Sequence, residues 1–390
     1  MKHLAVFCDG TWNDRDATEH PTTVARFATL LERDTPDGVV PFYDAGVGVP
    51  EADMPFGPQG LWYRLRGGAL GDGLTKNIAD CYRFLIGAHA PGDRIHIFGF
   101  SRGAYTARSL AGLIRNCGLP RDAAHLDAAL RWYRSRAPSQ APGTERSHAF
   151  RAEISPDVHT SPEEAAWREA RGIDPGVPVD IGYLGIWDTV GAHGIGGVLG
   201  QFRYGVPGGH GFHDHDLSRL VKSGRHALSL DEDRLVFRPT RWSNLEHLNA
   251  LAEEEGRGPR PYRQVWFPGV HGIVGGGGAE RRIANRVAAW IAEGAQEAGL
   301  AIDLSADPDF ALTDDDHMGD VTVPAGGLDP TRVLRWPRRG PGPGALDALH
   351  PVARRRVRED ETYRPASLRA ALLDEATYAA LMRGESSRLA

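Results

Sequence analysis

Short apolar segments alternate with longer helical segments over about the first 300 residues of this chain, and that alternation most constrains its fold. Each apolar segment is long enough for one strand and lacks a polar face, as in strands whose sheet is covered on both sides. Helices that connect such strands give a parallel sheet. With 390 residues, 41% of them hydrophobic, the chain can bury a core of this size. We predict an α/β fold with a doubly wound, mostly parallel sheet, with strands at 4–7, 39–43, 95–98, 181–187 and 265–270 and helices at 77–88, 104–114 and 283–298.

A Gly-x-Ser-x-Gly motif, Gly99 to Gly103 with Ser101 at its centre, joins the third predicted strand to the helix after it. A strand, a sharp turn and a helix around this motif are typical of the nucleophile elbow of α/β-hydrolases. Side chains at Gly99 and Gly103 would collide with the adjacent helix or strand. The helix after Ser101 directs its free N–H groups toward an oxyanion formed there. The motif predicts a serine hydrolase that acts by acyl transfer.

A serine nucleophile needs a histidine base and an acid that orients the imidazole, in the chain order Ser, acid, His. Asp188 follows the strand at 181–187, and His271 follows the strand at 265–270. We therefore expect both at the sheet edge that carries Ser101. Asp188 as a turn or helix cap and His271 as a structural histidine are the alternatives, and His350 is a rival base.

The oxyanion hole is expected to consist of backbone N–H groups. One belongs to Arg102, the residue after the nucleophile, and the other to Gly10 or Thr11, which follow the first strand. Asp9 precedes them, and since a carboxylate facing an oxyanion is unfavourable, we expect it to turn away and act as a cap.

His226 and Asp231 lie five residues apart on a helix predicted from Leu220. We expect them, like Asp9, to support the site rather than to take part in the chemistry.

Two long insertions, at about 119–179 and 191–261, interrupt the alternation. Connections this long seldom lack structure of their own, so we expect helical caps over the strand ends, where α/β proteins bind their ligands. The Pro/Gly-rich segment at 321–345 predicts a linker. Residues 1–320 would then form the catalytic domain, and residues 346–390 a helical tail packed on its core.

Composition argues against several classes of partner and site. A formal net charge of −6 disfavours nucleic-acid binding. Three cysteines, Cys8, Cys81 and Cys117, are too few and too scattered for a disulfide framework or a thiolate metal site. No apolar stretch is long enough to span a membrane, and the first strand is too short for a signal peptide. We expect a chain that is cytoplasmic as synthesised, has no cofactor or metal, touches membranes at most transiently, and leaves the cell only by a signal-independent route.

Six motifs occur in order along the chain: Phe7-Cys8-Asp9-Gly10-Thr11-Trp12-Asn13; Gly92-Asp93; Gly99-Phe100-Ser101-Arg102-Gly103-Ala104-Tyr105; Trp187-Asp188-Thr189-Val190-Gly191; His226-Ala227-Leu228 with Asp231-Glu232; and Trp266-Phe267-Pro268-Gly269-Val270-His271. Together they resemble the α/β-hydrolase domain family of the first class of type VI secretion phospholipase effectors and related uncharacterised proteins. The resemblance runs from residue 3 to about residue 300.

The resemblance implies a serine hydrolase with Ser101, Asp188 and His271 as its triad and with lipid or phospholipid acyl esters as substrates. Family members often continue past the histidine with Ser-Asp-Val-Gly-Gly-Gly, whereas Gly272 and Ile273 stand in the Ser-Asp positions here, which leaves Asp188 as the acid. Two other functions stay open: a non-catalytic binding module with a hydrolase fold, and a metal-dependent phosphoester hydrolase that uses Asp9, Asp188 and His271.

Overall fold

A six-stranded parallel sheet forms the centre of the molecule, in the order β2-β1-β3-β6-β7-β8. The computed structural model describes residues 1–10, 19–46, 68–135, 137–190, 216–234, 237–322, 342–368 and 374–384. The strands of the sheet are β1 (His3–Cys8), β2 (Val39–Asp44), β3 (Arg94–Phe100), β6 (Asp180–Trp187), β7 (Gly224–Ser229) and β8 (Tyr262–Phe267). The predicted α/β fold with a parallel sheet is confirmed.

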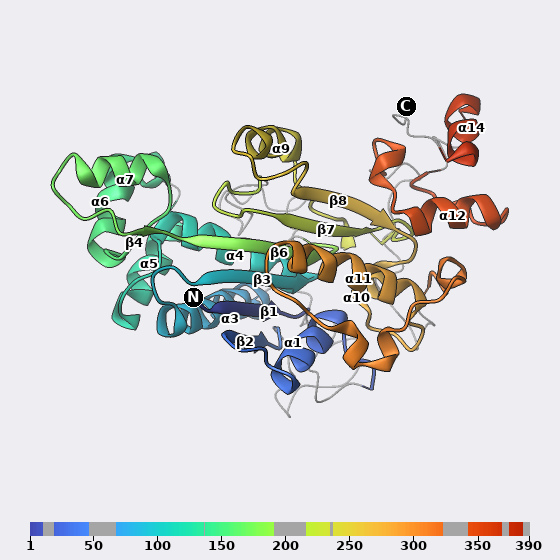
Figure 1. The fold of residues 1–390 in the computed structure, drawn as a ribbon, viewed down its shortest axis with the longest axis horizontal. Coiled ribbons are helices and arrows are strands. Elements are labelled where there is room, and N and C mark those ends of the chain that lie inside the picture. The colour runs from blue at the N-terminus through green and yellow to red at the C-terminus, as the bar shows by residue number, and fades with distance from the viewer. Residues whose placement is uncertain are drawn as a thin grey trace.

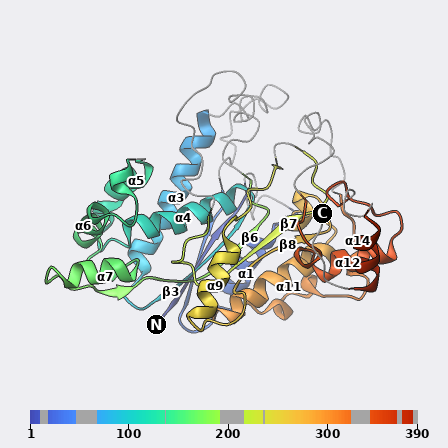
Figure 2. The same ribbon diagram turned by 90° about the horizontal axis from the view of Figure 1, so that it is seen from above.

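Helices cover both faces of this sheet (Figures 1 and 2). The helices α3 (Gly68–Ala88), α4 (Arg102–Cys117) and α9 (Leu245–Glu254) contribute to the core on one face, and α1 (Thr23–Arg33) and α11 (Arg282–Glu297) to the core on the other. Successive residues of a strand point alternately into the two cores: Val6 and Ile97 face α4, whereas Phe7 and Phe98 face α1. This two-sided burial is why the strands read as continuous apolar runs.

The strand order changes direction between β1 and β3. The chain places β2 on one side of β1 and β3 on the other, and every later strand of the sheet follows on the β3 side. In open α/β sheets, ligands bind beyond the carboxyl ends of the strands at such a switch point. Ser101 directly follows β3 at this position.

The insertion at 119–179 lies at the other end of the strands. It forms α5 (Leu126–Arg134), α6 (Glu145–Ile154), α7 (Pro162–Glu169) and a small sheet of β4 (Val158–His159) and β5 (Val177–Pro178). Figures 1 and 2 show these helices at the side of the molecule where the chain begins. The chain then enters β6 at Asp180, which pairs with Arg94 at the start of β3. The expected cap over the edge that carries Ser101 is therefore wrong for this segment.

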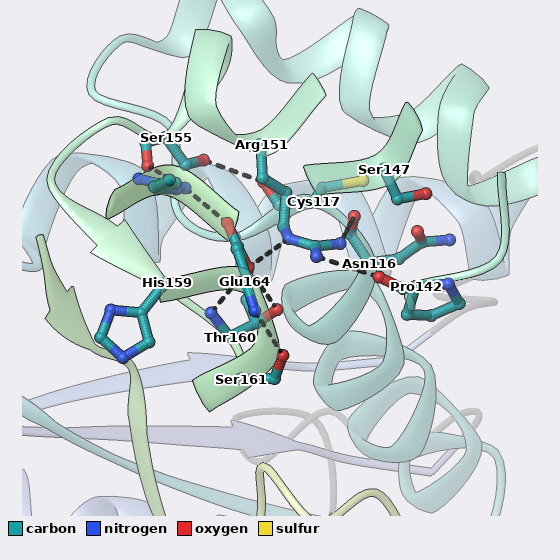
Figure 3. A network of polar contacts seen from close by, with 12 residues as sticks. Asn116, Cys117, Pro142, Ser147, Arg151, Ser155, His159, Thr160, Ser161 and Glu164 are labelled. Carbon is teal, nitrogen blue, oxygen red and sulfur yellow. Dashed lines mark hydrogen bonds and ion pairs between the residues drawn. The ribbon is translucent and has the colours of Figure 1, made fainter. Parts of the chain in front are cut away.

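A buried charge cluster attaches this insertion to the far end of α4 (Figure 3). Glu164 accepts hydrogen bonds from Arg151 at 2.6 Å and from Arg168 at 2.5 Å, and all three side chains are at most 1% exposed. Arg151 also donates to the carbonyl oxygens of Asn116, in α4, and of Pro142. Buried ions are tolerated only with such additional partners. The cluster therefore fixes α6 and α7 to the end of α4 that is remote from Ser101.

The second expected insertion contributes to the sheet itself. Residues 191–215 lie outside the described residues, but the rest of 191–261 supplies β7 and α9. The helix predicted from Leu220 is wrong, because His226 lies in β7 and Asp231 in the turn after it. The polar pair Arg225 and His226 concealed this strand, although both side chains are buried.

The C-terminal helices α12 (Pro351–Glu359) and α14 (Glu375–Arg383) pack beside β8, where Leu349 forms a bridge with Trp266 (Figure 1). Residues 323–341, most of the expected linker, lie outside the described residues. Within the described part of the chain, no helix has the length and apolar character needed to cross a bilayer.

Candidate active site

Ser101 lies in a strained turn between β3 and α4. Its φ of 58° is positive, as in only two other non-glycine residues in the described part of the chain. A Cβ on Gly99 would lie 2.5 Å from the carbonyl oxygen of Gly103, and one on Gly103 would lie 2.0 Å from that of Cys8. The turn thus lies in close contact with both α4 and the end of β1. This lack of space is why the elbow motif has glycine at both positions.

The imidazole of His271 lies between Ser101 and Asp188. His271 begins the short helix α10 (His271–Gly275), and its Nε2 is 2.8 Å from Ser101 Oγ. Its Nδ1 is 2.6 Å from Asp188 Oδ2. With the ring proton on Nδ1, His271 donates to Asp188 and its Nε2 accepts from the serine hydroxyl. All three side chains are buried, and Asp188 is 0% exposed. The structure therefore brings together the three residues that the sequence predicts as nucleophile, base and acid.

Ser229, the last residue of β7, holds the Asp188 carboxylate. Its backbone N–H donates to Oδ1 at 3.0 Å and its hydroxyl to Oδ2 at 2.8 Å. Asp188 itself has a φ of 39°, so its backbone also adopts a conformation that side chains disfavour. Sequence reasoning did not find Ser229, because its role depends on β7 lying next to β6.

His226 holds the backbone that follows Asp188. The Thr189 N–H donates to His226 Nε2 at 3.2 Å, and His226 Nδ1 donates to Gln264 Oε1 at 3.0 Å. Burial lowers the pKa of His226 well below its ordinary value, so the ring is neutral and its Nε2 accepts. The structure thus gives His226 contacts of the supporting kind that the sequence suggested, but from a strand.

Two carboxylates hold the turn that carries His271. Asp231 Oδ2 accepts from the Gly269 N–H and from the Tyr363 hydroxyl, both at 2.6 Å. Burial raises the pKa of Asp231. Glu232 Oε2 accepts from the backbone N–H of His271 at 3.1 Å. β8 ends at Phe267, earlier than the predicted 270, so the residues before His271 form this turn instead of a strand.

Asp9 ties the end of β1 to its neighbours. Its Oδ2 accepts from Thr22 Oγ1 at 2.6 Å and from the Tyr43 hydroxyl at 2.9 Å, and Thr22 is the N-cap of α1. Its Oδ1 accepts from the Gly10 N–H at 2.6 Å. The Gly10 N–H is therefore engaged by Asp9 in this structure, and Thr11 lies outside the described residues.

Arg102 is the first residue of α4, so its backbone N–H is at the positive end of the helix dipole beside Ser101. Burial lowers the pKa of its guanidinium to about 10, which leaves the side chain charged at neutral pH. The Arg102 N–H is thus next to Ser101, where the sequence predicts an oxyanion donor.

His350, the rival base, is the N-cap of α12. Its Nδ1 accepts from the Val352 N–H at 3.2 Å, and its ring stacks on Phe267 with 4.3 Å between centroids. Burial lowers its pKa to about 3. Among the described residues, no group of three or more His, Cys, Asp or Glu side chains is arranged to hold a metal ion.

The chain matches one protein family over most of its length. The model of the family described as type VI secretion system (T6SS) phospholipase effector Tle1-like, catalytic domain, matches residues 2–294. An uncharacterized protein of Saccharomyces cerevisiae, YEL023C, is 31% identical over 123 residues, which are 30% of this chain and 18% of the yeast protein. The resemblance drawn from the six motifs is confirmed.

Two solved structures are also similar to the chain. One is an uncharacterized protein from Pseudomonas aeruginosa, with 18% identity and a TM-score of 0.40, covering 80% of this chain and 49% of that one. The other is a Tle1 effector solved bound to the VgrG spike of the type VI secretion system, with 15% identity and a TM-score of 0.34, covering 70% of this chain and 51% of that one. The chain spans about half the length of these two proteins and less than a fifth of the yeast protein.

Proposed function

The chain belongs to the family of Tle1-like phospholipase effector catalytic domains, and on that basis we propose that it is a serine hydrolase acting on the acyl esters of phospholipids. The observation that carries the proposal is the pair of contacts made by His271, at 2.8 Å to Ser101 Oγ and at 2.6 Å to Asp188 Oδ2. These are hydrogen-bond distances in the order required for nucleophile, base and orienting acid.

In the first half of the proposed reaction, Ser101 Oγ attacks the ester carbonyl carbon while His271 Nε2 takes its proton. Asp188 accepts from Nδ1 and stabilises the imidazolium that forms. The backbone N–H of Arg102 and the positive end of α4 stabilise the charge on the carbonyl oxygen. His271 then gives its proton to the departing alcohol oxygen, which leaves the acyl group on Ser101.

In the second half, water replaces the alcohol. His271 takes a proton from the water as it attacks the acyl-serine, and the same oxyanion donors stabilise the second tetrahedral intermediate. Return of the proton to Ser101 Oγ releases the fatty acid. Each proton that His271 accepts is given back within the same half-reaction, so the base is regenerated at the end of each half.

A fluorophosphonate probe, which labels activated serines, tests the nucleophile directly. We expect one added probe per chain, located at Ser101 by peptide mass spectrometry, and no labelling in Ser101→Ala or His271→Ala. Circular dichroism of both variants checks that they are folded. Folded wild-type protein that takes up no probe, or a label on another serine, would contradict the proposal.

Phospholipid vesicles test the substrate class. We expect release of fatty acid and lysophospholipid from phosphatidylethanolamine or phosphatidylglycerol vesicles, and no release in Ser101→Ala. Release of a phosphorylated headgroup would instead support the phosphoester alternative.

A further inference from the structure

Two aromatic rings enclose the imidazole of His271. Phe100, the last residue of β3, lies with its ring centroid 4.7 Å from that of His271 at a tilt of 30°. Phe237, between β7 and α9, lies at 4.6 Å with a tilt of 24°. Two phenyl rings are too broad to share one imidazole face at these distances, so His271 lies between them.

Phe100 is held rigidly on its side of the imidazole. It is 4% exposed, and a Cβ on Gly275 would come within 2.2 Å of its Cζ. The Phe100 ring therefore occupies the space that a side chain at position 275 would need. Because Gly275 belongs to α10, the same short helix that begins with His271, the Phe100 ring packs against the element that carries the imidazole.

On the other side of the imidazole, Phe237 contacts an arginine that is itself ion-paired. The guanidinium carbon of Arg234 lies 4.2 Å from the Phe237 ring centroid, and the guanidinium donates two hydrogen bonds to Glu232, each of 2.8 Å. Glu232 also accepts from the His271 backbone N–H. These contacts form a closed loop from Glu232 through Arg234 and Phe237 to His271, so the carboxylate that fixes the His271 backbone also fixes the ring over its side chain.

Among the described residues, the charged groups that contact His271 or pair with its contacts come from two elements. Asp188 lies at the end of β6, and Glu232 and Arg234 lie in the segment after β7. Burial raises the pKa of Glu232, but Arg234 outweighs burial and brings it below its ordinary value, so Glu232 is ionised at neutral pH. Beyond α10, Arg281 donates to the carbonyl oxygens of Pro21 and Gly276, and Arg282 pairs with Glu280.

We propose that Phe237 is a positioning residue, which with Phe100 forms an aromatic clamp on His271. The proposal rests on the proposed function, in which His271 is the base. The clamp prevents rotation of the imidazole away from Ser101 and Asp188. The faces of the two rings also attract the imidazolium that forms when His271 takes the serine proton. Since this attraction develops only in the transition state, it increases kcat rather than the affinity for substrate.

A pair of substitutions separates the aromatic face from simple bulk. Phe237→Leu keeps an apolar side chain but no ring, whereas Phe237→Tyr keeps the ring at a position that is only half-buried. In hydrolysis of a p-nitrophenyl ester, we expect Phe237→Leu to lower kcat by about tenfold with little change in KM. Phe237→Tyr should stay within about twofold of wild type.

The pH profile supplies a readout that a purely structural role would not move. The neutral imidazole is the base, so activity falls as His271 becomes protonated on the acid side. Without the ring, the imidazolium is less stable and forms only at lower pH. The acid limb of kcat/KM should therefore move to lower pH in Phe237→Leu and stay in place in Phe237→Tyr.

An NMR titration of the His271 imidazole in each folded variant gives a test that does not depend on turnover. Its midpoint should lie at lower pH in Phe237→Leu than in wild type or Phe237→Tyr. An unchanged midpoint with an unchanged kcat, or equal losses in the leucine and tyrosine variants, would overturn the clamp. Absence of Ser101-dependent hydrolysis in the wild type would overturn the proposed function, and the titration would still decide whether the rings stabilise the imidazolium.

Discussion

Replacing Gly103 by alanine tests whether the close approach of α4 to β1 sets the geometry of the site. The added Cβ would lie 2.0 Å from the Cys8 carbonyl oxygen and 2.4 Å from that of Asp9, whereas ordinary contacts begin at about 3.4 Å. Both neighbours are backbone atoms at the end of a buried strand, so neither can move aside by rotating a side chain. The start of α4 and the end of β1 must therefore separate by more than an ångström. Ser101 and the Arg102 N–H lie in the turn that would shift.

The expected cost follows from that displacement. Overpacking of a rigid site costs about 1–3 kcal/mol of unfolding free energy, and a misplacement of about 1 Å costs on the order of 10²-fold in rate. We expect Gly103→Ala to lose stability in this range in urea denaturation and to lose about 100-fold in kcat/KM on a p-nitrophenyl ester.

Gly112 on the same helix provides the matched control for Gly103→Ala. The nearest atoms to a Cβ at Gly112 would be at the end of the Tyr133 side chain, with its hydroxyl oxygen at 2.9 Å, and a side chain can shift where backbone cannot. Alanine also favours a helix interior over glycine by about 1 kcal/mol. Gly112→Ala should therefore keep wild-type activity and equal or greater stability. If Gly103→Ala behaved in the same way, the argument from close backbone approach would be refuted.

Three further predictions concern the acid and the rival base. Asp188→Asn should lower kcat on the order of 10⁴-fold in ester hydrolysis while leaving the protein folded; an unchanged kcat would point to another acid. Ser229→Ala removes one hydrogen bond to the Asp188 carboxylate, worth about 1.5 kcal/mol, and should lower kcat roughly tenfold, whereas a loss as large as that of Asp188→Asn would mean that the fold is damaged. Burial lowers the pKa of His350 to about 3, so between pH 6.5 and about 3 this histidine is protonated in the unfolded chain but not in the folded one. In urea unfolding, the free energy of unfolding should therefore fall by about 1.4 kcal/mol for each pH unit below 6.5 because of this residue. His350→Asn keeps an N-cap acceptor for Val352, and should remove that part of the pH dependence and retain esterase activity; loss of activity would make His350 the base.

The parts of the site that could be predicted from the sequence have local signals. Gly99, Ser101 and Gly103 occur in one motif, between an apolar strand and a helix. The two glycines of this motif already indicate that the turn has no room for side chains at those positions. Asp188 and His271 are far apart in the chain, but each follows an apolar run. Parallel strands end at the same sheet edge, so position after a strand was enough to predict that the two residues would lie close together.

Other parts had no such signal. The sequence identified 119–179 as an interruption, yet its position follows from the buried partners of Arg151 and Glu164 at the far end of α4, which lie on separate elements. Phe237 resembles any other aromatic residue until the fold places it beside His271. In both cases the deciding contacts join residues whose pairing no local pattern encodes.

The strand that was not predicted, β7, together with the turn after it, contacts both the turn that carries the acid and the turn that carries the base. Arg225 and His226 make its sequence look unlike a buried strand. The partners that allow these two side chains to be buried lie on other elements, in Glu293 and Glu297 of α11 and in Gln264 of β8. From β7 and the turn after it come the donors to the Asp188 carboxylate, the acceptor for the Thr189 N–H and the acceptors for the Gly269 and His271 N–H groups. The turns that carry Asp188 and His271 are therefore both attached to one short segment. A displacement of β7 would act directly on the turns that carry acid and base, and it would reach Ser101 through β6, because the Ser101 N–H donates to the Trp187 carbonyl oxygen at 3.0 Å. We infer that His226 and Ser229, polar residues in an interior strand, are there because they hold the turn that carries Asp188.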